Sequence, residues 1–261
     1  MIDPRQIADE LILAERGRKP LAPFTDAYPD LDVASAYTAA RLVVQQRLDS
    51  GEQFVGFKLG LTSRAKQQAM GVAAPLFGRV TSGMLAPYGE PVDLASLIQP
   101  RVEPEIAFLL ARNVAGPAAT VTSVLAATEA VFAAIDVLDS RYQDYRFRLA
   151  DVVADNASAA RILVGPQARP PALLVDLGLL GCVLRVDGEV VATAAGAAAM
   201  GHPAAAVAWL ANRLAEHGEV VPAGALVFSG GLTAPIPLRP GVSVSAEFDG
   251  LGQVEVFATS R

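Results

Sequence analysis

The sequence predicts an α+β protein in which a helical N-terminal segment precedes a larger, mainly β region. Two observations lead to this prediction. Apolar residues recur at helical spacing in the first part of the chain, and from Phe54 onward short apolar runs alternate with glycine and proline turns. We therefore assign residues 1–52 to a helical segment and residues 53–261 to the main domain, and expect one continuous unit.

The first helix is predicted to begin at Asp3. Asp3 is a typical N-cap, Pro4 suits the first turn, and Gln6 stands where a capping box has its partner. Gly17 is predicted to end the helix. The residues expected to be buried follow helical spacing: Ile7, Leu11 and Ala14.

A second helix is predicted after a polar connection that contains prolines, with Asp32 as its N-cap. Its apolar positions are again spaced as on a helix: Val33, Tyr37, Ala40, Val44 and Leu48. The two helices together account for the N-terminal segment.

The main domain begins with runs that are typical of strands: FVGFKLGLT, APLFGRVTSGMLAPYGEPVD and RVEPEIAFLLARN. The next run, TVTSVLAATEAVF, has helical spacing and leads directly into AAIDVLDSRY, which we interpret as a strand. Asp187 and Gly188 suit a type I′ turn, so GCVLRVDGEVVATA predicts a hairpin. HPAAAVAWLANRLAEHG predicts an amphipathic helix that Gly218 ends, and the remainder predicts a strand, a glycine-rich loop, a turn and two more strands.

Composition excludes several classes of function. The net charge is −6 and no basic cluster stands out, so we expect no nucleic-acid binding. The single cysteine, Cys182, excludes an internal disulfide and is expected to pack as a small apolar residue. The charged N-terminus is unlike a secretion signal, and no apolar run approaches a membrane span. We expect a cytoplasmic protein without membrane contact.

Two glutamates open the third strand of the main domain. Glu103 and Glu105 are two residues apart, so their side chains point to the same face of the sheet. That face could be exposed to solvent, but the apolar run IAFLLA follows at once and predicts burial on both faces. Like charges that are buried together need a cation, which would be a lysine, an arginine or a metal ion. Asp136 lies in a similar strand context, and three acids on neighbouring strands would suit Mg²⁺ or Mn²⁺.

Other polar residues have both a structural and a functional interpretation. Lys58 lies between apolar neighbours and either extends to solvent or pairs with an anionic substrate. Asn156 and Ser158 lie in VVADNASAAR, which is typical of an Asx turn. His202 precedes a helix and His217 ends it, so neither is predicted to bind a metal.

Six ordered blocks cover almost the whole chain: GFKLGLTSRAKQQAMGV, VEPEIAFLLAR, DVLDSRY, VVADNAS, GAAAMGHPAAAVAWLANRLAEHGE and GLGQVEVF. Together they resemble the 2-oxo-3-hexenedioate (4-oxalocrotonate) decarboxylases and 2-hydroxypenta-2,4-dienoate hydratases, which belong to the fumarylacetoacetate hydrolase superfamily. The resemblance implies a mixed β-roll core for residues 53–261, which would be the catalytic domain.

The resemblance also implies the roles of individual residues. Glu103, Glu105 and Asp136 correspond to the ligands of a divalent metal, although many close relatives carry glutamate at the third position. Lys58 corresponds to the active-site lysine. The substrate-binding residues expected on the same basis are Leu59, Gly60, Thr62, Leu76, Asn156, Ser158, Arg161 and Gly230.

The choice between the two activities depends on smaller features. Hydratases of this kind usually carry an acid in a P-D-F-G motif, whereas this chain has PLFG with Leu76. Protonation and orientation of water suit a carboxylic acid, while loss of CO₂ suits an apolar pocket. Tyr142 in DSRY, Arg161 and the run GGLTA also resemble the decarboxylases.

The resemblance therefore implies metal-dependent decarboxylation of 2-oxo-3-hexenedioate to 2-hydroxypenta-2,4-dienoate and CO₂, in meta-cleavage degradation of aromatic compounds. The alternatives are the hydratase, an acylpyruvate hydrolase and a catalytically silent partner of the hydratase. The hydrolase is disfavoured because no histidine can be placed beside the acids to activate water. We also expect a 2-oxo dicarboxylate substrate, a homo-oligomer and a complex with the pathway's dienoate hydratase.

Overall fold

The fold is taken from a computed structural model, which describes residues 2–72 and 74–260. The α-helices are α1 (Pro4–Gly17), α2 (Phe24–Ala27), α3 (Val33–Asp49), α4 (Arg64–Met70), α5 (Val121–Ala127), α6 (Leu149–Ala154) and α7 (Pro203–Ala215). Single 3₁₀ turns are η1 (Ser82–Met84), η2 (Leu94–Ser96), η3 (Gln143–Tyr145), η4 (Asn156–Ser158), η5 (Pro171–Leu173) and η6 (Gly196–Ala198). None of the helices in the described ranges is long and apolar enough to cross a membrane.

The strands form two sheets, and each contains both parallel and antiparallel pairs. The larger sheet has seven strands, in the order β2-β1-β9-β4-β5-β6 with β10 beside β4. Its strands are β1 (Phe54–Gly60), β2 (Leu76–Thr81), β4 (Arg101–Leu110), β5 (Thr128–Leu138), β6 (Ala159–Val164), β9 (Leu226–Phe228) and β10 (Ile236–Pro237). The smaller sheet has the order β3-β12-β11-β7-β8. Its strands are β3 (Val92–Asp93), β7 (Gly181–Val186), β8 (Glu189–Ala195), β11 (Ser243–Phe248) and β12 (Gly252–Thr259).

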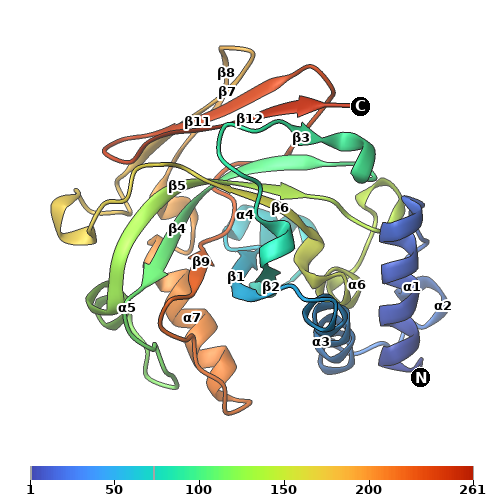
Figure 1. The fold of residues 1–261 in the computed structure, drawn as a ribbon. Helices are drawn as coiled ribbons and strands as arrows, with labels where there is room; N and C mark the ends of the chain where they lie inside the picture. The colour runs from blue at the N-terminus through green and yellow to red at the C-terminus, as the bar shows by residue number, and fades with distance from the viewer. Residues whose placement is uncertain (1, 73, 261) are drawn as a thin grey trace.

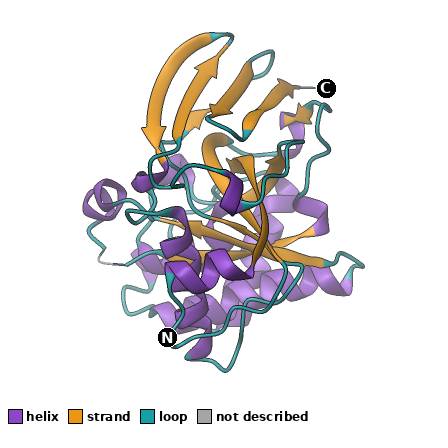
Figure 2. Cartoon of the chain, turned by 90° about the vertical axis from the view of Figure 1, so that its left-hand side faces the viewer, coloured by secondary structure: helices purple, strands orange, loops and turns teal. Residues whose placement is uncertain are grey.

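The two sheets and the helices form distinct layers. The smaller sheet covers one side of the curved strands β4 and β5, while most of the helices gather at the opposite end of the molecule (Figures 1 and 2). The main core lies between the sheets and α7, and includes Ile106, Val131, Val207 and Val254. The mixture of helices and mixed sheets confirms the α+β prediction.

The N-terminal helices begin as predicted. The Asp3 side chain accepts a hydrogen bond from Arg5 N at 2.9 Å, and the helix includes Gly17 as its last residue. The predicted capping box is wrong, because Gln6 donates its side-chain hydrogen bond to Glu10 at 3.0 Å. Asp32 caps α3 by accepting from Ser35 N at 2.7 Å, as predicted.

The N-terminal segment packs directly on the main domain. Helix α3 contacts α6 and β2, and its buried residues are Ala36, Ala39, Ala40, Val43 and Val44. Leu76 of β2 and the fully buried Tyr142 belong to the same apolar cluster as α1. The division at residue 52 remains a prediction.

One predicted boundary is wrong. The helical run that begins at Thr120 was expected to extend to Phe132, but α5 ends at Ala127 and strand β5 begins at Thr128. The segment that begins at Thr128 pairs with β4, where its first partner is Leu110. This long-range pairing, and not the local helical spacing, determines its conformation. The other later elements follow the prediction, including the hairpin turn, where Asp187 and Gly188 both have positive φ.

Candidate active site

Three carboxylates gather on one face of the larger sheet. Strands β4 and β5 are antiparallel, and their register places Glu103 opposite Asp136 and Glu105 opposite Ala134. Residues that are paired across two strands lie on the same face, and so do residues two positions apart on one strand. All three carboxylates therefore point to the same side of the sheet. The exposed fractions are 7% for Glu103, 0% for Glu105 and 1% for Asp136, so the alternative of a solvent-exposed face is wrong.

Lys58 supplies one positive charge to this group. Its side chain is only 2% exposed, and its ammonium forms an ion pair with Asp136 and donates to the Ala157 carbonyl at 3.0 Å. Lys58 therefore does not extend to solvent. Strands β1 and β5 are three positions apart in the sheet, or about 14 Å if the sheet were flat. The sheet must curl to bring the two residues into contact.

Lys66 supplies a second positive charge, which was not predicted from the sequence. Helix α4 follows β1, with Ser63 as its N-cap, and places Lys66 Nζ 2.6 Å from Glu103 Oε1. The same ammonium donates to the Gly231 carbonyl at 3.0 Å. The available signal was its place in the first block of the resemblance, shortly after Lys58. The contact with Glu103 joins residues 37 positions apart, which no local pattern reveals.

The charges of this group do not balance. Three carboxylates face two ammonium groups, and Glu105 Oε1 and Asp136 Oδ1 are buried without a hydrogen-bond partner. Burial raises the pKa of Glu105 well above its ordinary value, and the neighbouring Asp136 charge adds to this shift. Burial also raises the pKa of Asp136, against the opposing effect of Lys58.

The oxygen atoms of this group fit a hard divalent cation. Buried carboxylate oxygens without partners are the ligands that Mg²⁺ and Mn²⁺ prefer, and such a cation would balance the excess negative charge. In the described part of the chain, however, no three acidic, histidine or cysteine side chains stand in a ready-made ligand arrangement. Lys58 pairs with Asp136 and Lys66 pairs with Glu103. These two carboxylates would therefore turn toward an ion when it binds.

A strained turn positions the carbonyl that Lys58 contacts. Asn156, Ala157 and Ser158 have φ values of 49°, 58° and 54°, a conformation that is uncommon for residues other than glycine. The Asn156 side chain holds the turn through two hydrogen bonds of 2.8 Å with the backbone of Arg79. The Ser158 hydroxyl donates to Asp155 Oδ2 at 3.0 Å. The predicted polar cluster is thus a turn whose backbone reaches the site.

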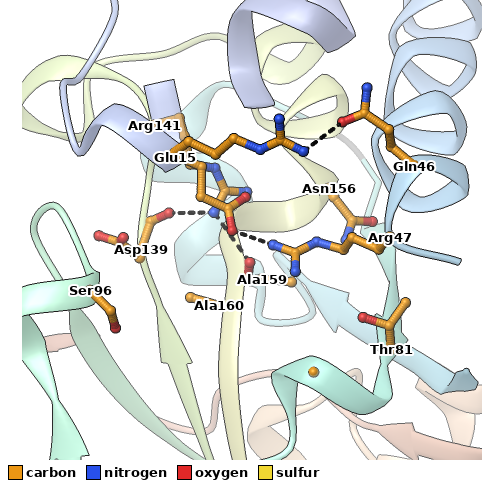
Figure 3. A network of polar contacts seen from close by, with 12 residues as sticks. Glu15, Gln46, Arg47, Thr81, Ser96, Asp139, Arg141, Asn156, Ala159 and Ala160 are labelled. Carbon is orange, nitrogen blue, oxygen red and sulfur yellow. Dashed lines mark hydrogen bonds and ion pairs between the residues drawn. The ribbon is translucent and has the colours of Figure 1, made fainter. Parts of the chain in front are cut away.

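The base of this turn is held by a buried ion pair. Arg141 pairs with Asp155 and also donates to the carbonyls of Asp139 at 2.8 Å and Ala159 at 3.2 Å. Figure 3 shows Arg141 beside Asp139 and Ala159, with Glu15 meeting Arg47 from the N-terminal helices. Burial raises the pKa of Asp155 to about 6, despite the neighbouring Arg141 charge. Arg141 also interacts electrostatically with Glu15 of α1, whose carboxylate pairs with Arg47 of α3.

Two adjacent glycines let the backbone approach the acids. Gly230 has φ 92° and its N–H donates to Glu105 Oε2 at 2.8 Å. A Cβ at Gly230 would lie 2.2 Å from Thr62 Oγ1, and one at Gly231 would lie 1.8 Å from Glu103 Oε2. No larger residue fits either position without a shift of its neighbours.

The other residues predicted to bind substrate are divided between two faces. Gly60 and Leu76 are paired on the face of Lys58, with Leu76 only 2% exposed. Leu59 points to the opposite face and packs in the main core. Arg161 is also directed away, since it donates to Ser96 Oγ at 3.3 Å. The structure thus brings Gly60, Leu76, Thr62, Gly230 and the backbone of the turn 156–158 to the site. It does not bring the side chains of Leu59 or Arg161, and the Ser158 hydroxyl is bonded to Asp155.

A cavity of about 1030 Å³ lies beside the acidic group. Its lining includes the polar residues Lys66 and Thr62 and apolar residues such as Met200 and Leu232. Lys66 joins the cavity to the carboxylate cluster through its contact with Glu103. A small molecule in the cavity would meet both cationic and apolar groups.

Comparisons with known proteins agree on one family. The model described as fumarylacetoacetate (FAA) hydrolase C-terminal matches residues 57–256. The chain is 42% identical over 248 residues to a 4-oxalocrotonate decarboxylase of Pseudomonas sp. (strain CF600), covering 95% of this chain and 94% of the relative. It is 39% identical over 255 residues to a 2-keto-4-pentenoate hydratase of Burkholderia vietnamiensis (strain G4 / LMG 22486), covering 97% and 96%.

A solved structure extends the likeness to the fold. The 4-oxalocrotonate decarboxylase from Pseudomonas putida G7, complexed with magnesium and adipate, matches with a TM-score of 0.94 and 37% identity. The match covers 98% of this chain and 97% of that one. This likeness confirms the mixed β-roll architecture that the resemblance in sequence implied.

Proposed function

Because the chain belongs to the fumarylacetoacetate hydrolase family, we propose that it decarboxylates 2-oxo-3-hexenedioate (4-oxalocrotonate) to 2-hydroxypenta-2,4-dienoate and CO₂. The reaction belongs to the meta-cleavage degradation of aromatic compounds. The observation that carries the proposal is the buried group of three carboxylates and two lysines, in a chain so similar to a decarboxylase whose structure contains magnesium.

Glu103, Glu105 and Asp136 would hold a divalent cation, Mg²⁺ or Mn²⁺. When bound, this cation supplies Lewis-acid polarisation of the 2-oxo group of the substrate. Glu105 is positioned for this role by the Gly230 N–H, which leaves its other oxygen free of protein partners. Asp136 has one oxygen, Oδ1, free of protein partners, while its other oxygen pairs with Lys58.

Lys58 would act on the charge that develops during the reaction. Loss of CO₂ breaks the bond to the distal carboxylate, and its electron pair moves through the C3–C4 double bond onto the 2-oxo oxygen. An ammonium held in place by the Ala157 carbonyl can stabilise negative charge there without reorganisation. Thr62 Oγ1, which is buried without a partner, would position the substrate. Roles in binding for the remaining residues of the site, Gly60, Leu76, Asn156, Ser158 and Gly230, belong to the same proposal.

Leu76 favours decarboxylation over hydration. It lies beside Gly60 on the face of Lys58, nearly fully buried among apolar residues. An apolar side chain at this point weakens the solvation of a departing carboxylate and offers no proton for hydration.

The alternative is a 2-hydroxypenta-2,4-dienoate hydratase, which the 39% identity to the hydratase from Burkholderia vietnamiensis favours. The two activities are separated by supplying the magnesium-loaded protein with each substrate. We expect CO₂ and the absorbance of the dienol to rise with oxohexenedioate, and added pentadienoate to persist. If pentadienoate is consumed and oxohexenedioate releases no CO₂, the protein is a hydratase and the proposed decarboxylase activity is wrong.

The setting of the enzyme is part of the same proposal. We propose a cytoplasmic homo-oligomer that associates with the hydratase of the pathway, because the product is an unstable dienol that a bound hydratase would consume at once. Co-elution of the two proteins in size-exclusion chromatography tests the association, and separate elution at micromolar concentration contradicts it.

A further inference from the structure

We propose that Lys66 is a cation that a divalent metal displaces from Glu103, and that the freed ammonium then binds the second carboxylate of a dicarboxylate in the adjoining cavity. This inference rests on the proposed function, since it assumes metal binding by Glu103. It assigns a specificity residue for which neither the sequence nor the family resemblance gave a role.

Lys66 and a metal ion would compete for Glu103. Lys66 Nζ lies 2.6 Å from Glu103 Oε1, and the other oxygen, Oε2, is enclosed by Gly231. An ion bound to Glu103 would place two positive charges next to this ammonium in a poorly solvated site. The ammonium must therefore move away when the ion binds.

The Lys66 side chain has free space beside it, whereas the Lys58 side chain does not. The Lys66 side chain is 19% exposed and lines the cavity of about 1030 Å³. Lys58 is enclosed by Asp136 and the Ala157 carbonyl. A rotation of the Lys66 side chain therefore carries its charge from the acidic group into the cavity without unfolding α4.

The cavity suits an anion beside Lys66. None of the described residues that line it is acidic, and its charged members are Lys66 and Arg64 on the same helix. A substrate whose first carboxylate is held at the metal would place its second carboxylate in the cavity that these cations line. One ammonium would thus distinguish a dicarboxylate from a monocarboxylate of equal length.

The sequence contains only three lysines, which makes the exchange directly measurable. Lys19 is exposed, Lys58 is buried, and Lys66 lies at the site. Reductive methylation of the intact protein, followed by peptide mass spectrometry, reports all three at once. Lys19 serves as the reactive reference and Lys58 as the protected reference.

We expect Lys66 to react slowly in metal-free protein, where its ammonium contacts Glu103. With saturating Mg²⁺ it should react roughly tenfold faster or more, because this charge-assisted contact is lost. Adding adipate should protect Lys66 again, while hexanoate, a monocarboxylate of the same length, should not. Equal protection by both ligands would overturn the assignment to the second carboxylate.

Calorimetric titration of Mg²⁺ distinguishes failure of the Lys66 displacement from failure of the proposed function. Saturation by Mg²⁺ with no change in Lys66 reactivity would overturn the displacement and leave the proposed function intact. Absence of Mg²⁺ binding at millimolar concentration would instead overturn the proposed function itself.

A matched pair of variants tests the choice of cation. In Lys66→Met the preference of the magnesium-loaded protein for adipate over hexanoate should fall by roughly ten- to a hundred-fold. In Arg64→Met, which removes a cation from the same helix, the preference should remain. Loss of preference only in Arg64→Met would show that the carboxylate is assigned to the wrong residue.

Discussion

At the scale of single residues, the two lysines have separate proposed tasks, and Lys58 would act on the substrate. Lys58→Met should retain Mg²⁺ binding but lose turnover by roughly ten- to a hundred-fold, because one charge-assisted hydrogen bond contributes about 1.5–3 kcal/mol. Steady-state kinetics and a metal titration of the variant check this. A normal kcat with only a raised KM would show that Lys58 binds the substrate equally in the ground and transition states.

A substitution at Leu76 tests the choice between decarboxylase and hydratase. It is nearly fully buried beside Gly60, so Leu76→Asp would place a desolvated negative charge on the face of Lys58. Repulsion of the departing carboxylate should slow CO₂ release by at least about tenfold. Leu76→Asn is the matched control, since it is polar and of the same shape without the charge. An equal loss in both variants would mean that packing, and not charge, is the important property of this position.

Individual residues of the site were predictable where a strand pattern fixed them. The E-x-E spacing placed Glu103 and Glu105 on one face, and burial of the following run indicated a compensating cation. Lys66 was not predictable, because its partner lies on a strand 37 positions away and the contact depends on where α4 rests. A long flexible side chain leaves no periodic signal in the sequence.

At the scale of elements, the loop between β9 and β10 brings backbone into direct contact with the acids. A Cβ at Gly231 would lie 1.8 Å from Glu103 Oε2, so Gly231→Ala should displace this carboxylate and weaken Mg²⁺ binding at least about tenfold. Gly181→Ala is the control, because a Cβ there meets nothing within 4 Å. The measurement is the dissociation constant of Mg²⁺ by calorimetry. Unchanged binding in Gly231→Ala would remove Glu103 from the metal site.

Most elements followed from local signals, and the one wrong boundary between elements came from pairing between distant segments. Asp3 and Asp32 capped their helices, and Asp187-Gly188 formed the hairpin turn, because each acts through its neighbours. The segment from Thr128 to Phe132 became strand through its pairing with β4. Pairing between distant segments is invisible to helical periodicity, and the curl that unites β1 with β5 is equally a property of the whole sheet.

At the scale of the whole molecule, the buried acids make stability depend on both pH and metal. The folded pKa values of Glu105 and Asp136 are raised above the ordinary 4.5 and 3.8, so the folded state holds these protons more tightly than the unfolded state. Stability of the metal-free protein should therefore fall as pH rises from about 4 through the raised values. Thermal unfolding over pH 4 to about 8, compared with a Glu105→Gln variant, checks this. The variant should lose part of the pH dependence, and an unchanged slope would contradict the assignment.

Magnesium should oppose this trend, because the ion binds the ionised carboxylates. At a concentration of 100 times its dissociation constant, the gain in unfolding free energy should be about 2.7 kcal/mol at neutral pH. The gain should disappear in acid, where the carboxyl groups are protonated. The same melting curves with Mg²⁺ or with a chelator measure it. A gain that does not depend on pH would place the metal elsewhere on the molecule.

The central claim is that this fold decarboxylates oxohexenedioate with a metal held by the buried carboxylates. The most direct measurement is the initial rate of ¹³CO₂ release from oxohexenedioate labelled at the distal carboxylate, as a function of Mg²⁺, for wild type and Glu105→Gln. The account predicts a saturable, chelator-sensitive rate in wild type and almost none in Glu105→Gln, which keeps the shape of the side chain but loses its charge. Metal-independent release, or full release by Glu105→Gln, would contradict it.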